Sequence, residues 1–441
     1  MSRLVFTQDL LSRLRSDLLE CEDETCAILF GRSVEIDGTL SRIVVRESKE
    51  ASSSAYAIRT GIRAQLKPEF VAEVAQRARK TDESVIFVHT HPFSMNQFSR
   101  IDDEGEKQLM EFFQQRVPNA AHAAMLITPE VTIARELGKG RQLDVIGVGP
   151  EVTWSIKSTS ESNRARYDRQ IRAFGAAGQS ILKSLRVGIV GLGGTGSVVL
   201  QELAHLGVAD FLLLDPDVVE ETNLNRLIGA TPSDVGLPKV EVAKRWAQHI
   251  NPQIHIDARQ ESVLKVRSVR TLADTDFVFC CTDSHGSRAV LNQFAYQYLV
   301  PMIDTGVVIA VSENTVTHVA GRTQMLAPGL ACLVCANLLD PEEIRRDLLT
   351  DFERQADPYI LGENEPAPSV VSLNATISSM AVTMFLNACT GIPGSARFLN
   401  YNAMTGVSRP AMCAQHPSCI VCSSYGAIAR AEEWPLPARM N

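Results

Sequence analysis

A group of side chains that could bind one metal ion falls within residues 89–102, which read His-Thr-His-Pro-Phe-Ser-Met-Asn-Gln-Phe-Ser-Arg-Ile-Asp. His89 and His91 stand one residue apart after the apolar run 84–88, so both can reach one ion from the end of a strand. The proline that follows ends the strand and turns the chain. Asp102 can then supply a third ligand and leave a fourth position for water, as a hydrolytic zinc site requires.

The pattern H-x-H-P-x6-S-x2-D resembles the signature of the JAB/JAMM metallopeptidases, the family of deubiquitinating and ubiquitin-like-processing isopeptidases. Upstream, Glu24-Thr-Cys-Ala-Ile-Leu-Phe-Gly31 resembles the family's second element, a glutamate that enters a strand. The resemblance implies zinc ligation by His89, His91 and Asp102. It also implies that Glu24 is the general base toward the catalytic water and that Ser99 helps to stabilise the oxyanion.

A second chemical feature is the glycine-rich stretch after residues 186–190, which we expect to form a strand. Its glycines, placed between that strand and an expected helix, are Gly191, Gly193, Gly194 and Gly196. There the backbone can approach phosphates, and the N-terminus of the helix faces their negative charge. By itself such a loop is more typical of the dinucleotide site of a dehydrogenase.

The residues downstream of this loop favour a triphosphate over NAD. Asp215 ends the next expected strand, where its carboxylate can accept ribose hydroxyls of either cofactor. Asn223, Arg226 and Lys239 add an amide and two cations where a triphosphate would lie, and hydride transfer needs none of these. Asp283 follows the expected strand 276–281 and could hold magnesium on the phosphates.

Residues 164–423 resemble the adenylating domain of ubiquitin-activating enzymes and of the bacterial molybdopterin-synthase and thiamine-pathway adenylyltransferases. Besides the residues above, Arg166-Tyr-Asp-Arg-Gln170 and Cys281-Thr-Asp-Ser-His-Gly-Ser-Arg288 carry this resemblance. One departure is Ser284, where the bacterial relatives usually have asparagine. The resemblance implies that Asp215 binds ribose, that Asn223, Arg226 and Lys239 bind the phosphates of ATP, that Asp283 serves Mg²⁺, and that Arg169 reaches the ATP of the other subunit in a homodimer. The implied substrate is the C-terminal glycine of a ubiquitin-like protein, whose carboxylate attacks the α-phosphate and releases pyrophosphate.

Two C-x-x-C pairs, Cys332/Cys335 and Cys419/Cys422, predict a second metal site. Four thiolates suit a tetrahedral, closed and therefore structural Zn²⁺. Cys413 and His416 lie close in sequence and could substitute as ligands, but the paired spacing favours the four cysteines.

The order of expected elements indicates two α/β domains. Residues 1–150 predict an α+β domain, which the resemblance implies has the JAB/JAMM (cytidine-deaminase-like) fold. Its expected elements are a helix at 10–19, strands at 26–30 and 42–46, a helix at 68–80, the strand 84–88, a helix at 103–117, and strands at 121–128 and 131–135. We place a linker at 151–165, because 157–163 is polar and without periodicity. Residues 166–441 predict a Rossmann-like domain with a mainly parallel sheet, because strand-like runs at 186–190, 210–214, 254–257, 276–281 and 301–304 alternate with helix-length segments.

Composition narrows the class of protein. The chain has 441 residues, enough for two or three domains, and its 45% apolar and 21% charged residues are ordinary for a soluble protein. The net charge of −8 gives no basic footprint, so we expect no nucleic-acid partner. No apolar run approaches the length of a membrane span and the N-terminus lacks a signal peptide, so we expect no membrane partner and a cytoplasmic location. The ten cysteines then suggest metal binding or reactivity rather than disulfides.

Together these features predict a bifunctional enzyme that acts on the C-terminus of a ubiquitin-like protein. The peptidase could trim a precursor or remove the modifier from targets, and the sequence leaves both open. The activated protein could pass to a conjugating enzyme, or it could be a sulfur carrier that receives sulfur from a donor for cofactor or amino-acid biosynthesis. A third hypothesis is a non-catalytic scaffold in which one half is a degenerate binding module, and it is disfavoured because both sites look complete. Residues 336–369 contain no cysteine, so we expect the reaction to stop at the acyl-adenylate, with Cys413 as the reserve nucleophile.

Overall fold

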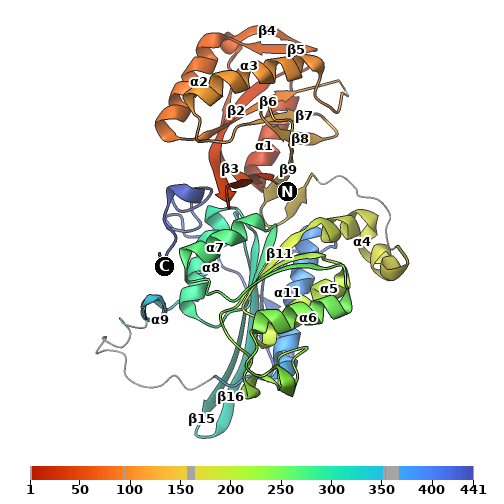
Figure 1. Ribbon diagram of the computed structural model, residues 1–441, viewed down its shortest axis with the longest axis vertical. Coiled ribbons are helices and arrows are strands. Elements are labelled where there is room, and N and C mark those ends of the chain that lie inside the picture. The colour runs from red at the N-terminus through yellow and green to blue at the C-terminus, as the bar shows by residue number, and fades with distance from the viewer. Residues whose placement is uncertain (1, 94, 156–163, 351–352, 354–366, 441) are drawn as a thin grey trace. The chain divides into compact units, whose positions relative to one another are not determined.

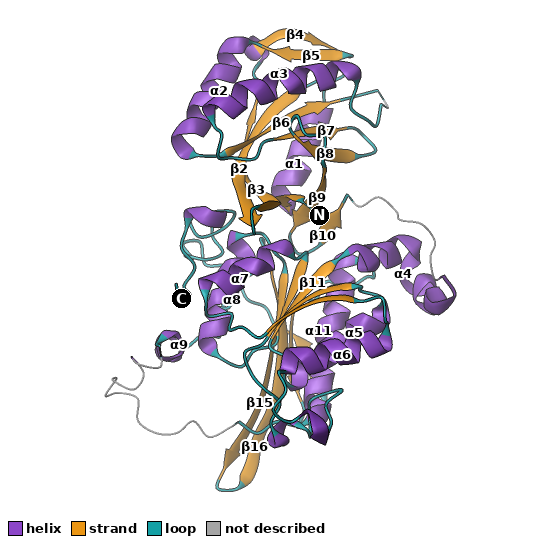
Figure 2. Cartoon of the chain, viewed as in Figure 1, coloured by secondary structure: helices purple, strands orange, loops and turns teal. Residues whose placement is uncertain are grey.

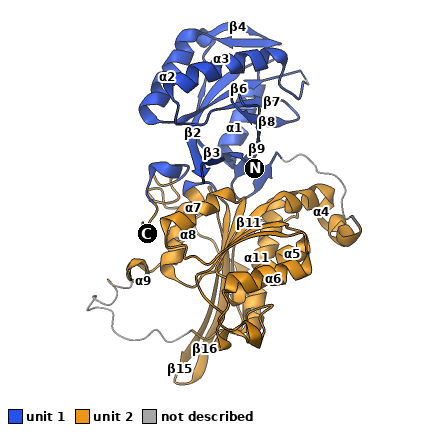
Figure 3. Cartoon of the chain, in the orientation of Figure 1, with its two compact units in different colours: residues 1–157, 297–299, 428–435 blue, residues 158–296, 300–427, 436–441 orange. Residues whose placement is uncertain are grey.

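The computed structural model describes residues 2–93, 95–155, 164–350, 353 and 367–440, and these form two compact units (Figure 3). Unit 1 comprises residues 1–157, 297–299 and 428–435, and unit 2 comprises residues 158–296, 300–427 and 436–441. The polar stretch that suggested a linker, 157–163, lies outside the described residues. Val152–Trp154, which we had also placed in the linker, instead form strand β10 and pair with β9.

Unit 1 is built on one eight-stranded sheet in the order β1-β3-β2-β6-β7-β8-β9-β10, and β1 also pairs with β9 (Figure 1). The strands are β1 (Arg3–Thr7), β2 (Cys26–Ile36), β3 (Thr39–Glu50), β6 (Ser84–Thr90), β7 (Ala123–Ile127), β8 (Thr132–Glu136), β9 (Gln142–Val148) and β10 (Val152–Trp154). A separate hairpin joins β4 (Tyr56–Thr60) and β5 (Arg63–Leu66). The helices are α1 (Gln8–Leu19), α2 (Pro68–Thr81) and α3 (Arg100–Arg116).

Two apolar layers cover this sheet. Leucines of α1 pack with Leu29, Ile86 and Met125 of the sheet in one buried cluster. Residues of α2 and α3 pack with a second set that includes Ile28 and Phe87. Neighbouring residues of one strand therefore enter opposite clusters, as alternation along a buried strand requires. The core holds β6, and with it His89, in a fixed position.

Unit 2 has an eight-stranded sheet in the order β13-β12-β11-β14-β15-β16-β17-β18. The first five strands are parallel: β13 (His255–Arg259), β12 (Asp210–Leu214), β11 (Arg186–Val190), β14 (Phe277–Cys280) and β15 (Met302–Ser312). The remaining three continue the sheet antiparallel: β16 (Thr315–Leu326), β17 (Phe398–Asn402) and β18 (Val407–Pro410). The α/β class and the mainly parallel sheet are thus confirmed, and the sheet extends further than the sequence suggested.

Helices lie on both faces of this sheet, with α7 and α8 on one face and α5, α6 and α11 on the other (Figure 2). The helices are α4 (Arg164–Ser184), α5 (Gly194–Leu206), α6 (Lys239–Ile250), α7 (Val266–Thr271), α8 (His285–Gln297), α9 (Pro341–Leu348) and α11 (Val371–Cys389). Among the described residues, α11 alone is long and apolar enough to cross a membrane by length and composition. Half of its most apolar window is buried within the structure, where it packs on α5, β15 and β16, so it is used here as a core helix.

Candidate metal and nucleotide sites

The end of β6 brings the predicted zinc ligands together. One ligand atom from each of His89, His91 and Asp102 lies within 4.8 Å of the others. His91 Nε2 is 3.5 Å from Asp102 Oδ2, and His89 Nε2 is 3.2 Å from Asp102 Oδ1. The buried Nε2 of His89 nevertheless has no well-aligned hydrogen bond, which leaves this nitrogen without the partner that a buried polar atom needs. Two imidazoles and a carboxylate with such an orphan atom fit zinc.

The charges around this cluster also suit a cation. Burial opposes ionisation of Asp102, but the neighbouring imidazoles of His89 and His91 outweigh it and hold the pKa of Asp102 well below its usual range. His91 Nδ1 lies 3.0 Å from the carbonyl oxygen of Met95. A proton on Nδ1 directed at that carbonyl leaves Nε2 free to bind the metal. Met95 was not predicted, because its backbone and not its side chain performs this role.

Asp102 is positioned by the start of α3, which begins at Arg100 and not at residue 103 as we expected. Ser99 is the N-cap: its hydroxyl accepts the N–H of Asp102 at 3.2 Å, and Asp102 Oδ2 accepts the N–H of Ser99 at 2.6 Å. The spacing S-x-x-D is the sequence sign of this reciprocal cap and could have located the helix start. The role of Ser99 toward an oxyanion stays a prediction, since the structure shows its hydroxyl in the cap.

Glu24 stands beside the cluster, with Oε1 3.8 Å from His91 Nε2. Burial raises the pKa of its carboxyl, which strengthens it as a proton acceptor. The β4–β5 hairpin holds it: Glu24 N–H donates to the carbonyl of Thr60 at 2.9 Å, and the N–H of Ala64 donates to its carboxylate. The hairpin residue Arg59 donates to the Glu24 carbonyl at 3.4 Å. These hairpin contacts join segments far apart in sequence and left no local signal.

In unit 2 the glycine loop connects β11 to α5. Gly191 has φ of +86°, and a side chain on Gly196 would collide with the Gly191 carbonyl, so both positions need glycine. The N-cap of α5, Gly193, faces open space, which leaves room for a ligand at this helix N-terminus. A side chain on Gly194 would collide with Asn374 of α11, a neighbour that the sequence did not indicate.

Three of the predicted nucleotide ligands gather around this loop. Asp215 is buried and accepts the N–H of Leu192 at 2.6 Å, so its carboxylate fastens the loop to the end of β12. Arg226 lies against Gly194, and its guanidinium donates to the Thr222 carbonyl at 2.7 Å. Lys239 Nζ pairs with Asp217 at 2.8 Å. Asp217 was missed, although it lies two residues after Asp215.

The remaining residues predicted for the nucleotide site lie in three different settings. Asn223 is buried in a short 3₁₀ helix, where its Oδ1 accepts the Glu220 N–H at 3.2 Å. Asp283 is exposed, three residues beyond the end of β14. The preceding backbone at Cys281 accepts from Thr195 Oγ1 at 3.4 Å, which brings this segment beside the glycine loop. Arg169 is exposed on α4.

The four cysteines of the C-x-x-C pairs converge in unit 2, with all Sγ atoms within 4.8 Å of one another. Cys332 Sγ is 3.6 Å from Cys419 Sγ, and Cys335 Sγ is 3.5 Å from Cys422 Sγ. A hydrogen bond from Cys422 lowers the pKa of Cys332 to about 5, and the same contact raises the pKa of Cys422. Four clustered thiols that stabilise a thiolate fit a tetrahedral zinc with no open position. Cys413 and His416 lie outside this set of four.

We expect two zinc ions per chain, held by separate sites. The double variant Cys332→Ser/Cys335→Ser should lose one ion and lower the melting temperature by several degrees, because a closed thiolate site contributes to folding. The variant His89→Ala/His91→Ala should lose the other ion and unfold close to the wild-type temperature. Native mass spectrometry and calorimetry measure both. Retention of two ions by the serine variant would contradict the four-cysteine site.

Comparison with known proteins gives two family matches. The family described as the ThiF family matches residues 167–421, and the family described as prokaryotic homologs of the JAB domain matches residues 7–137. The molybdopterin-synthase adenylyltransferase of Escherichia coli strain K12 is 32% identical over 266 residues, 60% of this chain and 98% of that protein. The SAMP-activating enzyme E1 of Haloferax volcanii is 29% identical over 264 residues, 59% of this chain and 89% of that protein. Among solved structures, Escherichia coli MccB with ATP has a TM-score of 0.47 and 20% identity, over 60% of this chain and 75% of that one.

Proposed function

The chain belongs to the ThiF family and carries a JAB-type domain in its N-terminal part, and from this premise we propose a bifunctional enzyme that acts on the C-terminus of a ubiquitin-like or sulfur-carrier protein. Unit 2 adenylates the terminal glycine with ATP, and unit 1 cleaves the peptide or isopeptide bond that follows this glycine. We place the enzyme in the cytoplasm, where ATP for the activation step is available.

The observation that carries the activation proposal is the grouping of Asp215, Arg226 and Lys239 around an open glycine loop. The loop N–H groups and the two cations neutralise the triphosphate, and Asp215 accepts ribose hydroxyls. Asp283 holds magnesium, and Asn223 contributes its amide. The carboxylate of the terminal glycine then attacks the α-phosphate, an acyl-adenylate forms and pyrophosphate leaves. The test is magnesium-dependent ATP–pyrophosphate exchange in the presence of ubiquitin-like proteins that end in Gly-Gly.

The observation that carries the peptidase proposal is the His89, His91 and Asp102 cluster beside a buried carboxylate. Zinc, when bound there, lowers the pKa of a water and polarises the scissile carbonyl. Glu24 accepts the proton of the attacking water and returns it to the leaving amine. Ser99 donates to the developing oxyanion. A chelator should stop cleavage of a fusion that continues beyond Gly-Gly.

Two classes of carrier suit this proposal, and relatives support each of them. The molybdopterin-synthase adenylyltransferase favours a sulfur carrier, whereas the SAMP-activating enzyme E1 favours a ubiquitin-like protein. We give priority to a prokaryotic ubiquitin-like pathway, because a peptidase that cleaves after the glycine can also reverse conjugation. The partner that receives the activated glycine distinguishes them: a conjugating enzyme in the first case and a sulfur donor in the second.

We expect a homodimer in which Arg169 completes the partner subunit's nucleotide site. Arg169→Ala and Lys239→Ala should each lose most exchange activity. Mixing the two proteins should restore part of it, because one site of a mixed dimer then contains both residues. Exchange activity after confirmed subunit exchange measures the rescue. No rescue would mean that Arg169 acts within its own chain or has no role.

We also expect no thioester on this chain. Burial raises the pKa of Cys281 to about 12 and also raises that of Cys280 and Cys389, so these thiols are poor nucleophiles. Burial also raises the pKa of Cys413. Incubation with ATP and a Gly-Gly protein should therefore give no reductant-labile adduct detectable by mass spectrometry. An adduct on Cys413 that disappears in Cys413→Ala would overturn this expectation.

A further inference from the structure

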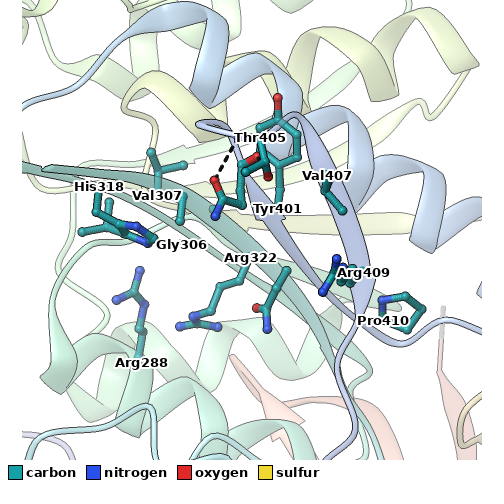
Figure 4. Close-up of a pocket in the computed structure, with 15 residues that line it drawn as sticks. Arg288, Gly306, Val307, His318, Arg322, Tyr401, Thr405, Val407, Arg409 and Pro410 are labelled. Atoms are coloured by element: carbon teal, nitrogen blue, oxygen red, sulfur yellow. Dashed lines mark hydrogen bonds between the residues drawn. The ribbon is translucent and has the colours of Figure 1, made fainter. Parts of the chain in front are cut away.

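A pocket of about 850 Å³ in unit 2 is lined by strands β15 to β18 together with Arg288 of α8 (Figure 4). Its lining contains three arginines, Arg288, Arg322 and Arg409, and one histidine, His318. Among the described residues that line it, none is an aspartate or glutamate. Val308 and Val407, both partly exposed, add apolar surface. We call this cavity the arginine pocket.

Two of the arginines are fixed by one buried carboxylate. Asp304 is fully buried, and its oxygens lie 3.3 Å from Arg288 Nε and 2.5 Å from Arg322 Nη1. Arg288 also donates to the Thr305 carbonyl at 3.1 Å. One carboxylate balances only one of the two guanidinium charges, so the wall of the pocket keeps a net positive charge to which Arg409 adds. Guanidinium groups held in this way lose little entropy when they bind an anion.

The strand pattern places Arg322 on the face of the sheet opposite α11. A side chain on Gly321 would collide with Ile377 of α11, so position 321 faces that helix. Arg322, the next residue of β16, therefore points to the other face. Gly306 is its cross-strand partner, and a side chain there would crowd the guanidinium. Gly306 thus leaves space for Arg322 to reach Asp304 and the pocket.

The arginine pocket lies near the predicted magnesium ligand. Asp304 pairs with Cys280, the last residue of β14, and Asp283 follows three residues later. The charge of Asp283 also reaches Arg288 and helps to raise the pKa of that guanidinium. A protein whose terminal glycine reaches the nucleotide beside Asp283 therefore passes close to the pocket. A small free anion would contact the arginines and leave the apolar wall of the pocket exposed to water. A peptide segment can contact both the arginines and the apolar wall.

We infer that the arginine pocket binds an aspartate or glutamate side chain of the carrier protein and so selects which carrier is activated. The inference rests on the proposed adenylation of a terminal glycine and specifies which carriers fit. A carboxylate can accept paired hydrogen bonds from Arg322 and Arg409 without any change in the buried Asp304 contacts. A lysine or arginine at the same place in a carrier meets like charge and is rejected.

The test uses fluorescent octapeptides that end in Gly-Gly, with glutamate moved in turn through the six preceding positions of an alanine and serine background. A matched set carries glutamine. We expect glutamate at one position, or at two neighbouring ones, to bind the full-length protein about tenfold more tightly than glutamine. The preference should vanish in Arg409→Gln and in Arg322→Gln. Equal binding of the two sets at every position, or a preference that persists in both variants, would overturn the inference.

Three controls separate the possible outcomes. Arg322→Gln leaves Asp304 paired with Arg288 alone. Asp304→Asn/Arg322→Gln removes one charge of each sign, so it keeps the net charge of the wild-type group, and it should also lose the preference. Arg409 is exposed, and its replacement should not affect folding.

Peptides with an amidated C-terminus should keep the glutamate preference. Loss of the preference would mean that the arginines bind the terminal carboxylate, which overturns the inference. Pyrophosphate exchange that proceeds equally with both sets refutes the selection and leaves activation standing, whereas tight glutamate-dependent binding without exchange refutes activation and leaves the pocket standing.

Discussion

Glu24→Gln is expected to lower the rate of cleavage after Gly-Gly by about 10²- to 10⁴-fold, the usual contribution of a general base. The amide fills the same space and cannot accept a proton. Zinc should stay bound, because the three proposed ligands are His89, His91 and Asp102. Cleavage of a ubiquitin-like protein fused to a fluorescent protein gives the rate, and metal analysis gives the zinc content.

The control for this variant is Glu22→Gln, which removes an exposed carboxylate two residues away and should leave the rate unchanged. Undiminished cleavage by Glu24→Gln would remove Glu24 from the mechanism. Loss of zinc together with activity would instead make Glu24 a ligand, and its position 3.8 Å from His91 Nε2 makes that outcome worth measuring.

The side chains of the candidate metal cluster in unit 1 could be predicted from the sequence, and the segments that support them could not. The three candidate ligands all fall within residues 89–102, and the spacing of two histidines on a strand and one aspartate after it is a local property. The helix start at Arg100 was also local and was missed, although the Ser99–Asp102 cap indicates it. The β4–β5 hairpin that holds Glu24 was unpredictable, because its contacts join residues more than 30 positions apart.

In unit 2, too, some elements could be predicted from the sequence and others could not. The buried parallel strands β11 and β12 end where the sequence predicted, since continuous apolar runs mark such strands clearly. The strands β16, β17 and β18 were missed. Residues of β16 such as Thr317, His318 and Arg322 interrupt any apolar run, because one part of this strand is exposed and another reaches the arginine pocket. Whether such a segment forms a strand depends on the neighbouring strands with which it pairs. The residues of the segment alone do not identify those neighbours.

Asp283→Asn is expected to lower magnesium-dependent ATP–pyrophosphate exchange by about 10²-fold or more, as loss of a major electrostatic contribution does. Asp283 is exposed beside the segment that contacts the glycine loop, so the change should not disturb folding. An amide keeps the shape but loses the charge that holds magnesium against the phosphates. Peptide cleavage should be unchanged, because Glu24 and the proposed zinc ligands belong to the other compact unit.

The matched control is Glu241→Gln, which removes an exposed carboxylate on α6 and should retain exchange. Exchange at the wild-type rate would remove Asp283 from the magnesium site, and loss of both activities in a folded variant would show that the two catalytic functions depend on each other.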